Sequence, residues 1–346
     1  MTKKNQVKEL FTFKRIAIPL VLGLGVTVFM LWKNTDWEVF SKVSWGVQAF
    51  AWMMVGLLMM VVRDLAYMYR IRVLTDNQIS WRNSFDIIML WEFSSAVTPG
   101  IVGGTGVALY ILNKEGLSAG KSTALVMLTA LFDQLFYIVT VPIVILIIGT
   151  QYLFPIELQK EFFGVVFSAK GIFVIGYLVT LLFSLIFSFG IFIKPQGLKK
   201  ILLVIFRLKY LKKWEHKMEQ VGDDIILTSR EFRSKSFLFW AKASLATFFA
   251  WTARFWLVNF LILAFTPVGE HFLIYGRQLV MWLVMVVFPT PGGAGVAELA
   301  FEGFLADFIP IGLAGLLAVL WRLASYYPYL FIGILVVPKW LKKVYS

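Results

Sequence analysis

The sequence has no cysteine, only two histidines and few charged residues, and each shortage excludes a class of protein. Without cysteine there are no disulfides, thiolate nucleophiles or Cys-ligated metals. His216 and His271 lie far apart in the sequence and offer no metal cluster. Charged residues make up 15% of the chain and hydrophobic residues 59%, so a soluble fold would lack the polar surface to cover its core. The composition therefore predicts a membrane protein, and it suggests neither a cofactor nor a metal.

Long apolar runs support this class. A helix needs about 20 apolar residues to cross the hydrocarbon core of a bilayer. Six runs approach that length: Ile16–Leu31, Val47–Met68, Ser122–Gly149, Ala169–Ile193, Phe237–Phe265 and Ile311–Val337. We therefore expect an all-α polytopic membrane protein, with residues 1–346 forming a single integral membrane domain.

Two further apolar regions are interrupted by proline and glycine. Ser84–Leu112 is broken at residues 98–104, and Phe272–Phe308 is broken at residues 289–295. Irregular backbone at membrane depth survives only where protein or a wet cavity satisfies it. We predict that both regions are re-entrant helical hairpins, which enter the membrane and return to the same side. Two full spans per hairpin is the alternative, and it leaves the topology of every other loop unchanged.

Basic residues gather in alternate loops. The net charge is +13, and a cytoplasmic N-terminus places most of the 33 lysines and arginines inside. The external loops then hold only Lys42 and Lys160 clear of span ends. This bias predicts a multi-pass protein of the cell (inner) membrane with both termini in the cytoplasm. The positive charge favours contact with anionic lipid rather than with nucleic acid.

The longest loop, residues 194–236, is cytoplasmic in this topology. Within it, Leu198–Trp214 alternates apolar and basic residues at helical spacing. Such a pattern predicts an amphipathic helix that lies on the inner leaflet. The alternative is an ordinary basic loop that obeys the charge rule.

The two broken hairpins resemble each other. Thr98-Pro99-Gly100 matches Thr290-Pro291-Gly292, and Gly103 or Gly104 matches Gly295. The order of spans around each hairpin also matches, with about three spanning helices per repeat. Repeat 1 covers about residues 12–149 and repeat 2 about residues 168–337. The two halves have opposite orientation, which is typical of transporters that expose a central site to each side in turn. The alternative is that the breaks are ordinary helix stops.

The chemistry of the breaks suits an anion. Proline ends a helix, glycine permits positive φ and close approach to the backbone, and the next helix begins with free N–H groups. A phosphate headgroup would be attracted to such a place. The candidate residues of the two breaks are Thr98, Pro99, Gly100, Gly103, Gly104, Thr290, Pro291, Gly292, Gly293 and Gly295.

Charged residues at membrane depth are candidates for function because an unpaired charge there is costly. They are Arg63, Asp64, Glu92, Asp133, Arg254, Glu298, Glu302 and Arg322. Arg63 and Arg254 occupy related spans, and an arginine fork suits a phosphate. Asp133 and Arg322 are hypothesised either to pair for structure or to serve the substrate. Glu298 and Glu302 would neutralise arginines or carry protons.

These motifs carry a resemblance. Residues 98–104, residues 289–299 and Trp321-Arg322 with Tyr326-Tyr327 resemble the flippase-like family of the lysylphosphatidylglycerol synthase transmembrane region. The resemblance covers nearly the whole chain and implies translocation of a phospholipid or a polyprenyl-linked lipid. It marks as functional Pro99, Gly100, Gly103, Gly104, Asp133, Pro291, Gly292, Gly293, Gly295, Glu298 and Arg322. The soluble transferase domain of the bifunctional members is not expected, so neither is lysyl-lipid synthesis.

The resulting prediction is a transporter-like protein whose partners are anionic or phosphate-bearing membrane lipids. No nucleotide, metal or nucleophile signature predicts an enzyme. A membrane-embedded glycosyl or acyl transferase is the first alternative, and Asp223-Asp224 is the only adjacent acidic pair in the long loop. A non-transporting assembly factor is the second. Protein partners, oligomeric state and the identity of the lipid stay open.

Overall fold

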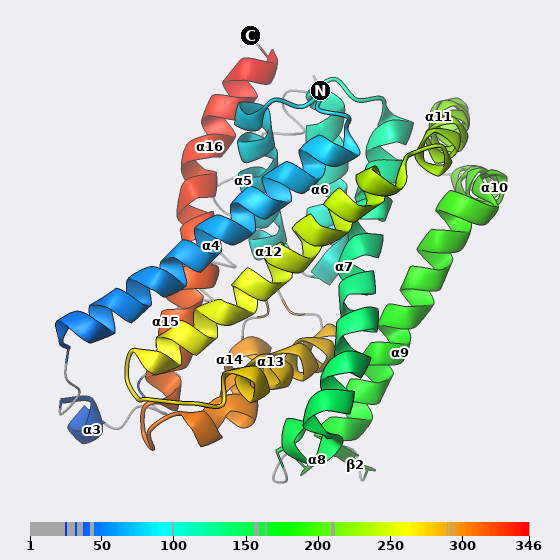
Figure 1. Cartoon of the computed structure of the whole chain (residues 1–346). Helices are drawn as coiled ribbons and strands as arrows, with labels where there is room; N and C mark the ends of the chain where they lie inside the picture. Colours follow the sequence, from blue (N-terminus) through cyan, green and yellow to red (C-terminus); the bar gives the residue numbers. More distant parts are fainter. Residues whose placement is uncertain are drawn as a thin grey trace.

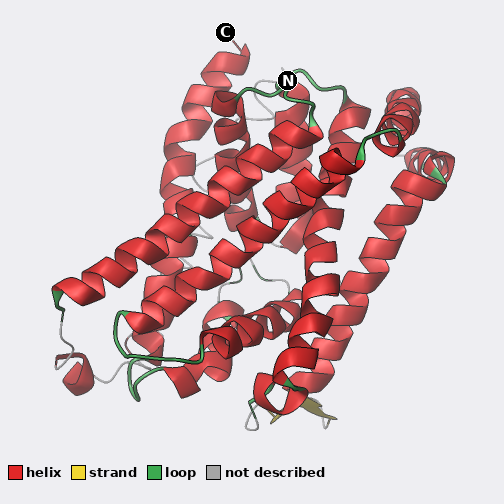
Figure 2. Cartoon of the chain, viewed as in Figure 1, coloured by secondary structure: helices red, strands yellow, loops and turns green. Residues whose placement is uncertain are grey.

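The computed structural model describes residues 25, 32, 37–41, 45–98, 100–155, 159–162, 165–208, 212–288, 290, 293 and 295–345. Almost all described elements are helices, with one small antiparallel pair of strands (Figure 2). The helices of the first half are α3 (Trp37–Ser41), α4 (Val47–Leu74), α5 (Trp81–Val97), α6 (Gly100–Lys114), α7 (Ala119–Ile148) and α8 (Thr150–Leu153).

The second half follows the strands β1 (Gln159–Phe162) and β2 (Val165–Ser168). Its helices are α9 (Ala169–Ser188), the π-helix η1 (Phe189–Ile193), α10 (Pro195–Phe206), the 3₁₀ turn η2 (Lys212–Trp214), α11 (Glu215–Arg233), α12 (Phe237–Leu263), α13 (His271–Val286), α14 (Val296–Leu305), the 3₁₀ turn η3 (Ala306–Phe308), α15 (Ala314–Ser325) and α16 (Tyr327–Tyr345). The expected all-α polytopic class is confirmed.

Five described segments are long and apolar enough to cross a membrane. They are α4, α7, α9 with η1, α12, and α15 with α16. Five of the six predicted spans are therefore confirmed. The remaining one, Ile16–Leu31, lies outside the described residues apart from Gly25.

Helices α4 and α12 run side by side across the bundle (Figure 1). Gly56 permits this close packing, because a Cβ at that position would lie 3.1 Å from Cδ1 of Leu257. Nearby, the rings of Trp52 and Phe260 stack with centroids 5.6 Å apart. The pairing of earlier residues on α4 with later ones on α12 makes the two helices antiparallel. The central arginines of the protein lie on these two helices.

The two broken regions form the helix pairs α5–α6 and α13–α14, which lie toward opposite ends of the bundle (Figure 1). Their arms have 17, 15, 16 and 10 residues. At about 1.5 Å per residue, even the longest arm is shorter than the hydrocarbon core of about 30 Å. The helical pairs are thus as expected, while the inverted repeat and the re-entrant geometry stay predictions.

The amphipathic helix of the long loop is shorter than predicted. Instead of Leu198–Trp214, α10 covers Pro195–Phe206. The chain turns after Phe206 because α11 packs back against α10, and Arg207 Nε lies 2.9 Å from a carboxylate oxygen of Glu215 at the start of α11. The apolar side chains Ile201, Val204 and Ile205 remain exposed, as expected of a helix that rests on a lipid surface.

Candidate functional site

Arg63 lies at the centre of a cluster of charged and hydrogen-bonded side chains. Its side chain is completely buried in α4, and it forms an ion pair with Glu92 of α5. Its Nη1 lies 3.1 Å from Asp64 and donates a 2.6 Å hydrogen bond to the hydroxyl of Tyr329 on α16. That hydroxyl donates in turn to Asp64 at 2.9 Å. Two carboxylates therefore neutralise Arg63, which ties together α4, α5 and α16.

A second cluster is built around Arg70, two turns further along α4. Its Nη1 lies 2.5 Å from Asp133 of α7 and donates to the hydroxyl of Thr247 on α12 at 3.1 Å. The indole N–H of Trp251 donates to the same oxygen of Asp133 at 3.0 Å. This cluster joins α4, α7 and α12.

Tyr67 connects the two clusters. Its ring centroid lies 5.0 Å from Cζ of Arg63 and 4.7 Å from Cζ of Arg70. The three residues are spaced by four and by three along α4, which places them on one face of the helix. Tyr67 therefore makes a cation–π contact with each guanidinium group, and these contacts stabilise both charges in an apolar surrounding.

Arg254 differs from the other arginines of the core. It is half-buried on α12, with Cζ 4.5 Å from the ring of Trp282 and 5.3 Å from the ring of Trp251. Within the described part of the chain it makes no hydrogen bond and no ion pair. Its positive charge therefore contacts aromatic faces only, while the carboxylates of Asp64 and Glu92 attract it from beyond ion-pair distance.

The charged and aromatic side chains form a continuous path through the bundle. It begins at Glu92 on α5 and ends at Trp282 on α13. Between them lie Arg63, Tyr67, Arg70, Asp133, Trp251 and Arg254, and each touches the next. The path crosses both halves of the chain, so the site belongs to neither half alone.

A separate buried pair stands at the second break. Glu298 is 1% exposed, and its Oε1 lies 3.1 Å from Nε of Arg322 on α15. The other carboxylate oxygen of Glu298 accepts from the N–H of Gly295 at 2.7 Å, which caps the start of α14. Gly293 and Gly295 have φ of 72° and 80°, so the predicted need for positive φ is confirmed at these two glycines.

This pair also contacts the first break. Cζ of Arg322 lies 3.9 Å from the ring centroid of Tyr326. The hydroxyl of Tyr326 donates to the carbonyl of Ala96 at 3.1 Å, two residues before Thr98. Glu298, Arg322 and Tyr326 therefore link the restart of the second hairpin to the end of the first helix in the other hairpin.

The first break is built differently from the second. Thr98 donates to the carbonyl of Ser94 in its own helix at 2.5 Å, and α6 already begins at Gly100, so Gly103 is helical. Gly104 lies against Ser95, and a Cβ there would come within 3.1 Å of the Ser95 Cα. The expected close approach is confirmed at Gly104. Its sequence match to Gly295 therefore does not extend to conformation.

Four further predicted site residues lie at or beside the two breaks. Pro99, Pro291 and Gly292 lie outside the described residues. The hydroxyl of Thr290 is buried and has no hydrogen-bond partner among the residues that the structure describes.

The predicted partners of the core charges need correction. Asp133 pairs with Arg70, and Arg322 pairs with Glu298, so the hypothesis of an Asp133–Arg322 pair is wrong. The sequence places Asp133 and Arg322 in helices that follow the two hairpins, but the ion-pair partners of these residues come from other elements. The sequence interpretation also missed Arg70, because the apolar run was ended at Met68 and Arg70 was assigned to a loop. Its spacing from Arg63 on one helical face was the signal that could have found it.

Comparison with known proteins gives two matches. Residues 16–333 match the family described as the lysylphosphatidylglycerol synthase TM region. A UPF0104 membrane protein of Archaeoglobus fulgidus is 24% identical over 331 residues, which cover 91% of this chain and 94% of that protein. No solved structure matches the chain.

Proposed function

We propose, since the chain belongs to the family of the lysylphosphatidylglycerol synthase TM region, that it moves a phosphate-bearing lipid between the two leaflets of its membrane. Family membership connects the chain with the handling of membrane lipids. The proposal adds transport, a phosphate as the recognised group, and a binding residue.

The observation that carries the proposal is the unpaired charge of Arg254. The other core arginines each face a carboxylate: Arg63, Arg70, Arg277 and Arg322. Among the described residues Arg254 contacts the rings of Trp251 and Trp282 and makes no ion pair, although Asp64 and Glu92 attract it from a longer distance. A guanidinium can bind a phosphate through two parallel hydrogen bonds while its plane stays stacked on an aromatic ring. The lipid phosphate would supply a directly hydrogen-bonded anion, which Arg254 does not have among the described residues.

The neighbouring clusters position this residue. Trp251 contacts Arg254 with its ring and is itself oriented by the hydrogen bond to Asp133. Asp133 is committed to Arg70, so it does not compete for the charge of Arg254. In this proposal the paired residues form the frame and Arg254 contacts the lipid.

The two hairpin breaks would supply the movement. The contact from Arg322 through Tyr326 to Ala96 ties the breaks together. A shift of one hairpin would therefore displace the other through these contacts. Alternating exposure of a central site requires such coupling. The predicted glycines of both breaks keep their proposed role as the points where the backbone changes direction.

The proposal also includes a location and an orientation: the protein lies in the cell membrane, and both of its termini are in the cytoplasm. The test is chemical labelling of single introduced cysteines in intact cells, because the natural sequence has none. Gln159→Cys should react with an impermeant maleimide from outside, and Glu219→Cys should react only after lysis. Labelling of both from the same side would contradict the topology.

A liposome assay tests the function itself. Purified protein in vesicles should move a labelled phospholipid without any sugar or acyl donor, and a labelled lipid that lacks phosphate should move much more slowly. Equal rates for the two lipids would contradict recognition of phosphate. Turnover that appears only with an added donor would favour the transferase alternative.

A further inference from the structure

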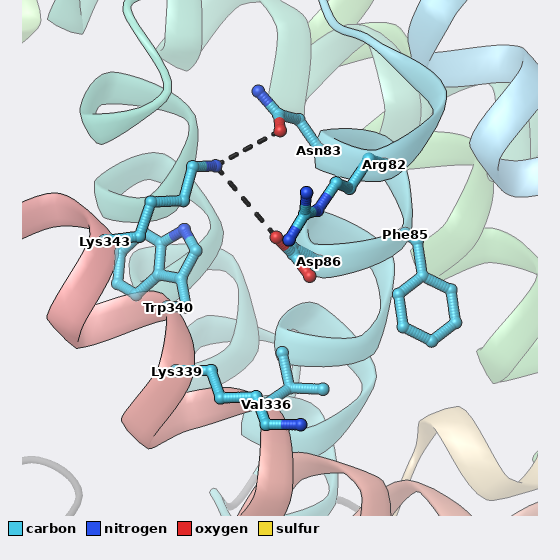
Figure 3. A pocket seen from close by; sticks show the side chains of 8 residues that line it. All are labelled: Arg82, Asn83, Phe85, Asp86, Val336, Lys339, Trp340 and Lys343. Atoms are coloured by element: carbon cyan, nitrogen blue, oxygen red, sulfur yellow. Dashed lines mark hydrogen bonds and ion pairs between the residues drawn. The ribbon is translucent and has the colours of Figure 1, made fainter.

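A pocket separate from the charged core opens between the first turns of α5 and the C-terminal half of α16 (Figure 3). Its volume is about 480 Å³, within the range of pockets that hold small ligands. Arg82 and Glu92 lie ten residues apart on α5, which separates the pocket from the Arg63 cluster by about 15 Å along the helix.

Three cations line the pocket, and two of them make no ion pair among the residues that the structure describes. Lys343 lies 2.9 Å from Glu115 and donates to Asn83 at 3.2 Å. Arg82 and Lys339 make no hydrogen bond or ion pair within the described part of the chain. The pocket thus offers a ligand two cationic side chains whose hydrogen-bond donors have no partner in the described structure.

The acidic side chains offset only part of this charge. Asp86 also lines the pocket and attracts both Lys343, at 4.0 Å, and Arg82, so one carboxylate in the lining faces three cations. Glu115 is held on both sides, by Lys343 and by the indole N–H of Trp340 at 2.7 Å. These contacts fix Lys343 and Trp340 in place and leave Arg82 and Lys339 on the rim.

The rest of the lining is apolar. Phe85, Val336 and Trp340 contribute to the wall, and Phe85 is 41% exposed. In Figure 3 Lys339 lies beside Val336, and Trp340 lies beside Lys343, so charged and apolar side chains alternate around the pocket. A ligand that fits this lining carries a negatively charged group and a hydrocarbon chain.

We infer that the pocket binds the phosphate headgroup and adjoining acyl chain of an anionic phospholipid. Arg82 and Lys339 contact the phosphate, and Phe85 and Val336 contact the chain. The lipid is bound at the side of the protein and is distinct from the lipid held by Arg254. The inference therefore goes beyond the proposed transport and does not depend on it.

Thermal stability of the full-length protein tests this inference. In phosphatidylcholine nanodiscs, adding phosphatidylglycerol should raise the melting temperature of the unaltered protein. The double variant Arg82→Gln/Lys339→Gln should melt at the same temperature in phosphatidylcholine but lose most of the added rise. The matched control Lys217→Gln/Arg233→Gln removes one lysine and one arginine from exposed positions of α11 and should keep the rise.

A second variant separates the pocket from its charge. Val336→Trp fills the cavity and leaves every cation in place, and it should also lose most of the rise. An equal rise with inorganic phosphate would show a site for free phosphate instead of lipid. A rise that persists in both variants, or that vanishes equally in the α11 control, would overturn the inference. Because the melting temperature reports lipid binding at this pocket, a negative result would contradict this inference without contradicting the proposed transport.

Discussion

Arg63 and Arg254 lie in spans that the sequence predicts to be related, yet their surroundings differ. Arg63 is completely buried and faces Asp64, Glu92 and a tyrosine hydroxyl. Arg254 is half-buried and faces the rings of Trp251 and Trp282. The same type of side chain thus makes ion pairs with carboxylates in one case and contacts aromatic rings in the other.

This difference indicates which of the two arginines can bind a ligand. A buried guanidinium that already has two carboxylates cannot take a phosphate without expelling them, and its removal would leave them uncompensated. An arginine held by aromatic faces keeps its hydrogen-bond donors free. Arg63 therefore suits a structural role and Arg254 a binding role, and the variants below test this division.

The largest effect is expected from Arg63→Gln. It strands the carboxylates of Asp64 and Glu92, so unfolding free energy should fall by about 3–5 kcal/mol. Arg254→Gln removes only cation–π contacts, so it should lower the unfolding free energy by less than about 1 kcal/mol. Unfolding in mixed micelles measures both. Equal losses for the two variants would erase the distinction.

Double-mutant cycles test which carboxylate pairs with which arginine. Asp133→Asn and Arg70→Gln should couple by about 0.5–3 kcal/mol, because the double variant removes both partners of one ion pair. Asp133→Asn and Arg322→Gln should add within about 0.5 kcal/mol, because these residues do not touch. Coupling in the second pair and none in the first would contradict the network described here.

The smallest effect is expected from Trp282→Leu. This change removes the closer of the two rings that hold Arg254, a contact of about 0.5–1 kcal/mol, and should slow lipid movement by about two- to fivefold. Trp52→Leu is a suitable control, because Trp52 stacks on Phe260 between α4 and α12 and contacts no arginine in the described structure. Equal slowing by both would show a general packing effect.

Much of the fold could be predicted from the sequence. Apolar length alone located five spans, and proline with glycine marked both hairpins. The positive φ of Gly293 and Gly295 and the close contact of Gly104 were also predictable, because they follow from what glycine permits. These features depend on local chemistry, which a sequence displays directly.

The pairing of charges could not be predicted in the same way. Asp133 and Arg322 match by position in the predicted repeat, but packing brings Arg70 to Asp133 and Glu298 to Arg322. Which carboxylate meets which arginine depends on helix rotation and on tertiary contacts that no spacing encodes. The special position of Arg254 became visible only once the partners of the other arginines were known.

The most direct test of the account is the rate of phospholipid movement in vesicles that contain Arg254→Gln. Hydrogen bonds to a charged group contribute about 1.5–3 kcal/mol, so the rate should fall by about ten- to a hundredfold while the protein stays folded. Arg254→Lys should recover little, since the planar fork is lost. Arg230→Gln, an equal loss of charge at an exposed position of α11, should keep the full rate. Full lipid movement by folded Arg254→Gln would contradict the central claim that Arg254 binds the lipid phosphate.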